Sequence, residues 1–189
     1  MKKLLLLSAL LIFACSYGQE DLTSPEISDL ETLNSNLFKN LFQGDFSNAK
    51  NILDKLIELD NEDAVWYNFR GICNHTLNEF QDAMEDYNYA LKLRPDYTFA
   101  YTNKGLLSYK LKDYETALIS FNMAIENAPE DYQGYLYRAI TNMKINDMKS
   151  ACIDLQKASN CDFYEGAAWY DLTKIYPTKH IDNLRKQCN

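Results

Sequence analysis

The sequence repeats itself with a period of about 34 residues, and this period limits the chain to a small set of folds. Gly71 and Gly105 lie one period apart. The same spacing separates further matching pairs, namely Tyr67 and Tyr101, Phe80 and Tyr114, Ala83 and Ala117, Tyr87 and Phe121, Ala90 and Ala124, and Pro95 and Pro129. A period of this length is typical of repeat arrays, in which each unit buries its apolar side against its neighbours. The register predicts four units, 30–63, 64–97, 98–131 and 132–165.

Each unit has the pattern of two helices joined by a short turn. In unit 98–131 the second helix is predicted from about Tyr114 to Asn127, with Ala117, Phe121 and Ala124 at i, i+4 and i+7. Pro129 ends this helix, because proline cannot continue it. The turn between the helices falls at Gly44, Asn78, Lys112 and Asn146 in the four units. Glycine and asparagine tolerate the left-handed backbone that such a turn often needs.

The pattern Tyr101-x3-Gly105…Ala117-x3-Phe121-x2-Ala124…Pro129 resembles the tetratricopeptide repeat, a helix–turn–helix of about 34 residues. The resemblance covers 30–165 and is weaker in the first and fourth units. It implies an all-α, right-handed α-solenoid of four helix pairs. Residues 19–29 would lead into the first helix, which is predicted to begin at Ser24-Pro25. Residues 166–189 would form C-terminal capping helices.

The resemblance also implies a concave groove, lined by the first helix of each unit, that binds a peptide or a partner helix. By register the groove positions are Asn34, Phe38, Leu41, Val65, Asn68, Ile72, His75, Phe99, Thr102, Leu106, Tyr109, Gln133, Leu136, Ile140 and Met143. The aliphatic side chains among these are expected to be used in packing against the next repeat. The predicted partner-binding residues are therefore Asn68, His75, Thr102, Tyr109 and Gln133.

Some members of the family hold an acidic chain end with Lys, Asn and Arg side chains on successive first helices. Only Asn103 matches that pattern here, because Asn68, Ile72, Gln133 and Tyr137 stand at the other positions. The charge-assisted hydrogen bonds that would fix a carboxylate are missing. The sequence therefore predicts a groove that does not bind an acidic chain end.

The first eighteen residues have the pattern of a signal peptide. Lys2-Lys3 precede an apolar run over 4–14, which is shorter than the roughly 20 residues of a membrane span. Ser16 and Gly18 are small residues at the −3 and −1 positions of a cleavage site after Gly18. The alternative is a lipoprotein signal with Cys15 as the acylated residue, and a cytoplasmic N-terminal helix is a third interpretation. The expected location is the periplasm or cell envelope, or the outer membrane for a lipoprotein.

Four cysteines follow this segment. Cys73 and Cys152 fall at helix positions that are predicted to face the core, where cysteine acts as a small hydrophobic residue. Cys161 and Cys188 are predicted to form a disulfide in an oxidising compartment. No metal site is expected, because the sequence has no CxxC motif and no histidine at a suitable spacing.

The charged residues give no catalytic signature. Glu79, Asp82, Glu85 and Asp86 are interpreted as a solvated helix face rather than an acid–base pair or a calcium loop. The only histidines are His75 and His180. Neither supports an enzyme or a cofactor site.

The net charge also restricts the partner. It is −8, and it becomes −10 if the signal is removed with its two lysines, so nucleic acid is not an expected partner. The predicted function is a non-enzymatic scaffold or adaptor of the bacterial cell envelope that binds a protein or peptide. A membrane would be contacted only through a lipid anchor. The alternatives are an accessory or regulatory subunit of an envelope enzyme complex and an enzyme with an unrecognised site. The oligomeric state is left open.

Overall fold

The computed structural model of the protein describes residues 25–161 and Cys188. The predicted signal over 1–18, with Cys15, lies outside these residues, and so do the predicted capping helices except for Cys188. The described residues contain eight α-helices and no strand. They are α2 (Pro25–Gln43), α3 (Phe46–Leu59), α4 (Ala64–Thr76), α5 (Phe80–Leu93), α6 (Thr98–Lys110), α7 (Tyr114–Asn127), α8 (Tyr132–Lys144) and α9 (Met148–Cys161).

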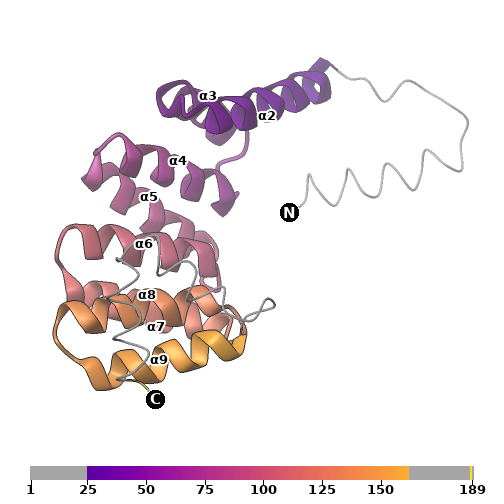
Figure 1. Ribbon diagram of the computed structural model, residues 1–189. Helices are drawn as coiled ribbons and strands as arrows, with labels where there is room; N and C mark the ends of the chain where they lie inside the picture. The colour runs from indigo at the N-terminus through magenta and orange to yellow at the C-terminus, as the bar shows by residue number, and fades with distance from the viewer. Residues whose placement is uncertain (1–24, 162–187, 189) are drawn as a thin grey trace, which may run out of the picture.

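The helices form four pairs that stack one on the next, from α2–α3 to α8–α9 (Figure 1). The strongest contacts lie within pairs and between the second helix of one pair and the first helix of the next. The first helices of neighbouring pairs also touch, α4 with α6 and α6 with α8. The prediction of an all-α solenoid is therefore confirmed.

Aspartates start most of the helices. Their carboxylates accept hydrogen bonds from backbone N–H groups that have no partner within the helix, which stabilises the helix start. The bonded pairs are Asp45 with Asn48, Asp63 with Val65, Asp113 with Thr116, Asp131 with Gln133 and Asp147 with Ser150, at 2.9–3.1 Å. The start of each of these helices is thus encoded by the aspartate that directly precedes it.

The turn inside each pair has one residue with a left-handed backbone. These residues are Gly44 (φ 74°), Asn78 (φ 66°), Lys112 (φ 65°) and Asn146 (φ 65°). The prediction from the repeat register is confirmed. Lys112 is the residue of the four that suits this backbone least. A Cβ disfavours the left-handed region, and lysine lacks the short polar side chain with which Asn and Asp offset that cost by local hydrogen bonds.

Two glycines set the distance between paired helices. A Cβ added at Gly71 would lie 2.6 Å from the ring of Tyr87, and one added at Gly105 would lie 2.5 Å from the ring of Phe121. Both rings are fully buried. In the fourth pair Ala139 faces the smaller Leu155, and both are buried. The size of the small residue therefore matches the size of the side chain opposite.

The core is continuous from one pair to the next. Leu37, Leu53 and Leu56 of the first pair share a cluster with Cys73, which belongs to α4 of the second pair. Cys73 is fully buried, as predicted, and burial raises the pKa of its thiol to about 11. It is therefore a protonated core residue at neutral pH.

The structure corrects the predicted disulfide. Cys188 pairs with Cys152, with a Cα–Cα distance of 5.0 Å, and does not pair with Cys161. Cys152 is half-buried beside the core rather than inside it. Cys161 lies nine residues further along α9, which places it about 13 Å away along the helix axis. Cys188 therefore lies beside the first half of α9 rather than beside its end.

This cross-link joins residues 36 positions apart. Closing a loop of that length restricts the unfolded chain, which stabilises the folded state by about 3–4 kcal/mol in the chain-entropy model. Cys188 also packs against the cluster of Tyr135, Leu136, Ala139 and Leu155. The disulfide thus fastens the end of the chain to the last repeat.

We expect Lys112→Asn to raise the free energy of unfolding by about 0.5–1 kcal/mol, because asparagine tolerates the left-handed backbone better. Chemical denaturation of both proteins measures the change. Lys144→Asn is the matched control, since Lys144 is exposed at the end of α8. An equal gain in both variants would show that the loss of a positive charge, and not the backbone, is responsible.

We expect Gly105→Ala to lower the free energy of unfolding by about 1–3 kcal/mol, because its methyl group overlaps the buried ring of Phe121. Combining it with Phe121→Leu reproduces the Ala139–Leu155 pair. The double variant should lose less stability than the two single variants predict when added. Strict additivity would contradict the proposed steric link between the two positions.

Candidate partner-binding face

The first helices α2, α4, α6 and α8 share one side of the stack, which we call the first-helix face (Figure 1). Because each pair repeats the geometry of the last, side chains one repeat period apart occupy equivalent positions on this face. The second helices α3, α5, α7 and α9 carry the opposite side. The two sides differ sharply in chemistry.

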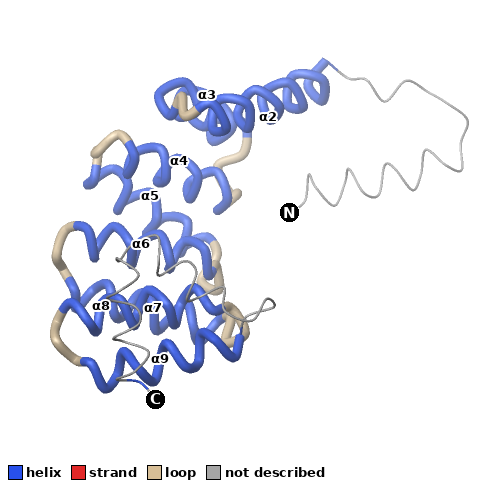
Figure 2. The backbone as a smooth tube through the Cα atoms, in the orientation of Figure 1, coloured by secondary structure: helices blue, strands red, loops and turns tan. Residues whose placement is uncertain are grey.

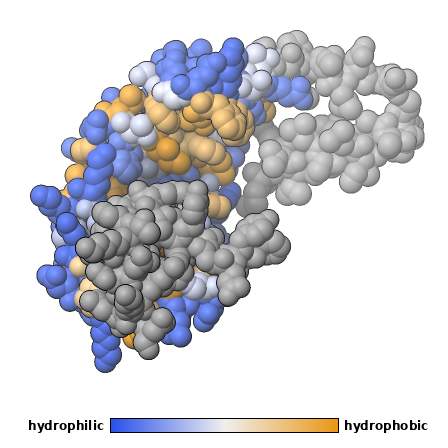
Figure 3. Space-filling view, in the orientation of Figure 1, coloured by the Kyte–Doolittle hydropathy of each residue, from blue (hydrophilic) through white to orange (hydrophobic). Residues whose placement is uncertain are grey.

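Phenylalanines give the first-helix face an apolar stripe. Phe38 and Phe42 are four residues apart on α2 and so lie on the same side of it. They are 47% and 91% exposed, and Phe38 meets Phe69 of α4 edge-on at 6.2 Å. Phe99 is 60% exposed. It stands at the position in α6 that the half-buried Val65 holds in α4. Figure 3 shows apolar side chains gathered below α2.

Exposure of this kind is uncommon for phenylalanine in a folded chain. Burying one such side chain fully stabilises a complex by roughly 1.5–3 kcal/mol relative to leaving it in water. Contiguous apolar patches are typical of surfaces that bind another molecule. We therefore define the apolar stripe as Phe38, Phe42, Val65, Phe69 and Phe99.

The predicted partner-binding side chains are less exposed to solvent than the sequence suggested. Asn68 and Thr102 are only 3% and 6% exposed. His75, Tyr109 and Gln133 are half-buried. Asn68 and Thr102 are therefore largely buried, and the assignment of the five residues to partner binding stays a prediction.

Asn103 matched one position of the acid-binding pattern, and its amide is already engaged. Its Nδ2 donates a hydrogen bond to Oδ1 of Asn68 at 3.0 Å. This bond links α4 to α6. The bond uses one of the two N–H donors of the Asn103 amide, and the lack of binding to an acidic chain end stays a prediction.

His75 is neutral near pH 7. Partial burial lowers its pKa, and the positive charge of Lys110 lowers it further. The imidazole meets the ring of Phe80 edge-on at 6.1 Å. His75 therefore adds a weakly polar, uncharged group beside the apolar stripe.

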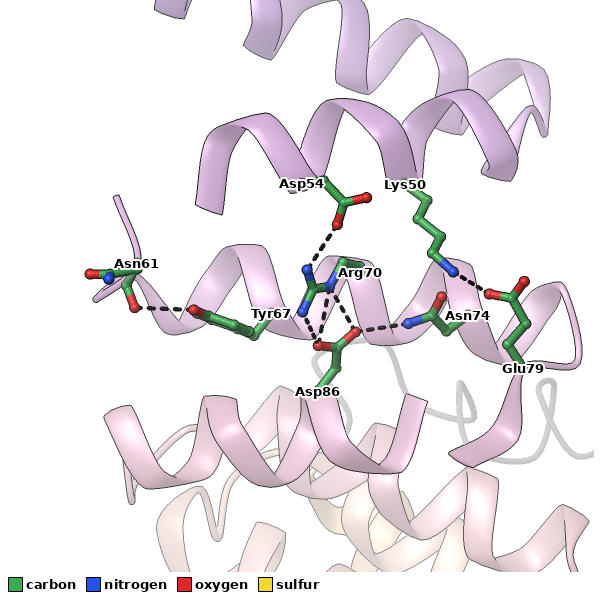
Figure 4. Close-up of polar contacts among 8 residues, drawn as sticks. All are labelled: Lys50, Asp54, Asn61, Tyr67, Arg70, Asn74, Glu79 and Asp86. Carbon is green, nitrogen blue, oxygen red and sulfur yellow. Dashed lines mark hydrogen bonds and ion pairs between the residues drawn. The ribbon is translucent and has the colours of Figure 1, made fainter. Parts of the chain in front are cut away.

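The opposite side contains a buried ion pair that sequence reasoning missed. Two nitrogens of Arg70 on α4 donate hydrogen bonds to Asp86 of α5, with the shorter at 2.7 Å, and a third donates to Asp54 of α3 at 2.8 Å (Figure 4). Asn74 donates to the same Asp86 at 2.8 Å. Asp86 is almost fully buried, which corrects its interpretation as part of a solvated helix face.

The same cluster recurs two repeats later. Arg138, Asn142 and Asp154 lie two full periods after Arg70, Asn74 and Asp86, and Arg138 donates to Asp154 at 2.6 Å. Asn122 replaces Asp54 as the third partner of the arginine, at 2.6 Å. The sequence signal for this cluster is the recurrence of Arg, Asn and Asp at twice the repeat period. The intervening unit 98–131 has Lys104, Ser108 and Ser120 at the matching positions.

These clusters join three consecutive helices and satisfy all of their charges. The hydrogen bonds with Asp86 and Asp54 raise the pKa of Arg70, so the guanidinium remains charged. Replacing one partner of such a pair lowers the free energy of unfolding strongly, because the remaining buried charge loses its partner. We interpret both clusters as structural links between repeats.

Two absences within the described residues bear on function. No group of three His, Cys, Asp or Glu side chains within 25–161 is placed to hold a metal ion. No helix in that part of the chain is long and apolar enough to cross a membrane.

Comparison with known proteins identifies the repeats. Two family models described as tetratricopeptide repeat match the chain, one over residues 41–98 and one over 100–131. None of the curated proteins matches the chain.

Solved structures share the fold. The structure of MamA residues 41 to the end from Desulfovibrio magneticus RS-1 aligns with a TM-score of 0.65 and 21% identity, over 84% of this chain and 92% of that one. The first tetratricopeptide repeat domain of Spaghetti (RPAP3), bound to the HSP90 peptide SRMEEVD, aligns at 0.58 and 23%, over 61% and 91%. YrrB, described as having an unusual peptide-binding site, aligns at 0.55 and 25%, over 61% and 60%.

The family models, the repeat register and the stacked helix pairs agree with one another. This chain belongs to the tetratricopeptide repeat family.

Proposed function

We propose that this protein is a non-enzymatic interaction module that binds a segment of a partner protein on its first-helix face. The exposed apolar stripe carries this proposal, because Phe38, Phe42 and Phe99 offer a large area to a partner at little cost in conformational entropy. Solved relatives of the fold bind peptides, as the HSP90 complex illustrates.

The chemistry of the face favours an apolar segment over an acidic chain end. Only Asn103 matches the acid-binding pattern, and the positions that would supply Lys and Arg hold uncharged side chains. His75 contributes no positive charge near pH 7. A segment that buries apolar side chains, either extended or as a helix laid across the first helices, fits these groups.

We further propose that the protein works in the cell envelope after export. The pattern of the first eighteen residues supports export, and cleavage after Gly18 is favoured over acylation of Cys15. The Cys152–Cys188 disulfide supports it independently, because disulfides persist in oxidising compartments and are rare in the cytosol.

Peptide selection tests the binding surface. The protein is used to select binders from a displayed library of random peptides, and the best binder is measured in solution. We expect Phe38→Ala combined with Phe99→Ala to weaken it by about 2–3 kcal/mol, or roughly 30- to 150-fold in Kd.

Ile119→Ala combined with Ile153→Ala is the matched control, since these exposed side chains lie on the second helices α7 and α9. This control should retain binding. Loss of binding in the isoleucine variant with retention in the phenylalanine variant would place the site on the opposite side.

Peptide mapping without reduction tests the location. In protein isolated from the native host we expect a mature chain that starts at Gln19 and a Cys152–Cys188 cross-linked peptide. A diacylglyceryl group on Cys15 would establish the lipoprotein alternative. An intact N-terminus together with free Cys152 and Cys188 would refute export.

A further inference from the structure

The loops that connect one helix pair to the next lie along a single edge of the first-helix face. They comprise 60–63, 94–97 and 128–131, and each leads directly into a first helix, α4, α6 or α8. The turns inside the pairs lie at the opposite edge (Figure 2). The two edges therefore offer different loops to anything that lies across the face.

The connecting loops are strongly acidic. They contain six acidic residues, Asp60, Glu62, Asp63, Asp96, Glu130 and Asp131, and one basic residue, Arg94. The turns at the opposite edge contain four acidic residues, Asp45, Glu79, Asp113 and Asp147, and one basic residue, Lys112. Lys110 and Lys144 end the helices that lead into two of these turns. The connecting loops are therefore the more acidic of the two edges.

Three of these carboxylates repeat in register. Glu62, Asp96 and Glu130 are spaced by one repeat period each, so they occupy the same place in three successive connecting loops. All three side chains are exposed. We call them the acidic row.

The acidic row has no partner among the described residues. The ion pairs found there are Lys50 with Glu79, Arg70 with Asp54 and Asp86, and Arg138 with Asp154, and none involves this edge. Asp63 and Asp131 cap α4 and α8, so the positive ends of these helices offset their charge. Glu62, Asp96 and Glu130 accept no hydrogen bond from the described part of the chain.

The acidic row borders the apolar stripe. Asp96 precedes Phe99 by three residues, and the ring of Phe99 meets that of Tyr97 edge-on at 6.0 Å. Glu62 likewise precedes Val65 by three residues. A segment seated on Val65 and Phe99 thus has the unpaired carboxylates of Glu62 and Asp96 along one flank.

We infer that the partner segment is amphipathic and basic. Its apolar side chains lie on the apolar stripe, and its Lys or Arg side chains face Glu62, Asp96 and Glu130. Complementary charge of this kind speeds association and fixes the orientation of the bound segment. This inference rests on the proposed binding at the first-helix face.

The peptide library provides the test. Binders selected by the natural protein should be enriched both in apolar residues and in Lys and Arg. The triple variant Glu62→Gln, Asp96→Asn and Glu130→Gln should select peptides that keep the apolar residues and lose the basic enrichment. The best natural binder should bind this variant about 10-fold more weakly at roughly 50 mM salt, with a much smaller difference at roughly 500 mM.

A second triple variant, Asp82→Asn, Glu115→Gln and Glu126→Gln, is the matched control. It removes the same number of exposed carboxylates from the second helices α5 and α7, so it changes the net charge equally. It should select the same peptides as the natural protein. Equal losses in both variants would show that overall charge, and not the acidic row, attracts basic peptides.

The outcomes separate this inference from the proposed function. Binders that require Phe38 and Phe99 but are neutral or acidic would overturn the basic partner and leave the binding face intact. Binders unaffected by Phe38→Ala with Phe99→Ala would overturn the binding face itself.

Discussion

The close approach of the two helices in the second and third pairs sets the geometry at the centre of the array. Gly71 and Gly105 remove the Cβ that would meet the rings of Tyr87 and Phe121, so the helices approach at a distance set by an aromatic ring against a bare backbone. Protein interiors are packed as densely as organic crystals, so a methyl group cannot be added without moving a neighbour. The fourth pair has Ala139 with Leu155 at these positions, and the first pair has two leucines, Leu37 and Leu53. The repeat period is kept in all four pairs, so side chains one period apart occupy equivalent places on the surface.

Charged residues reinforce this stack from one side. The Arg70 and Arg138 clusters join the second helix of one pair to both helices of the next, and each arginine donates from two nitrogens to a buried aspartate. Removing one partner of such a pair would leave the buried carboxylate of Asp86 or Asp154 without its counter-charge, so the arginine and the aspartate depend on each other. We attribute to these clusters the role of fixing how neighbouring repeats sit against each other.

The first-helix face keeps exposed apolar side chains. Its polar groups are largely used in contacts between first helices, as the Asn103–Asn68 hydrogen bond shows, while Phe38, Phe42 and Phe99 remain exposed. In the proposed complex, the apolar area would supply affinity and the unpaired carboxylates at the edge would orient the partner. This division of labour is common at protein interfaces, where a few aromatic anchors contribute most of the binding energy and charged groups at the rim set the rate and direction of association.

The sequence alone determined the local features: the helix pairs, the left-handed turns at Asn78 and Lys112, and the burial of Cys73. Each depends on residues close together in the chain or on a regular period. The tertiary structure decided the rest. Cys188 meets Cys152 and not Cys161, because a contact between residues 36 positions apart is not encoded by any local pattern. Asn68 and Thr102 were predicted to face the groove and proved to be buried, because periodicity gives the side of a helix on which a residue lies but not how closely the next helix covers it.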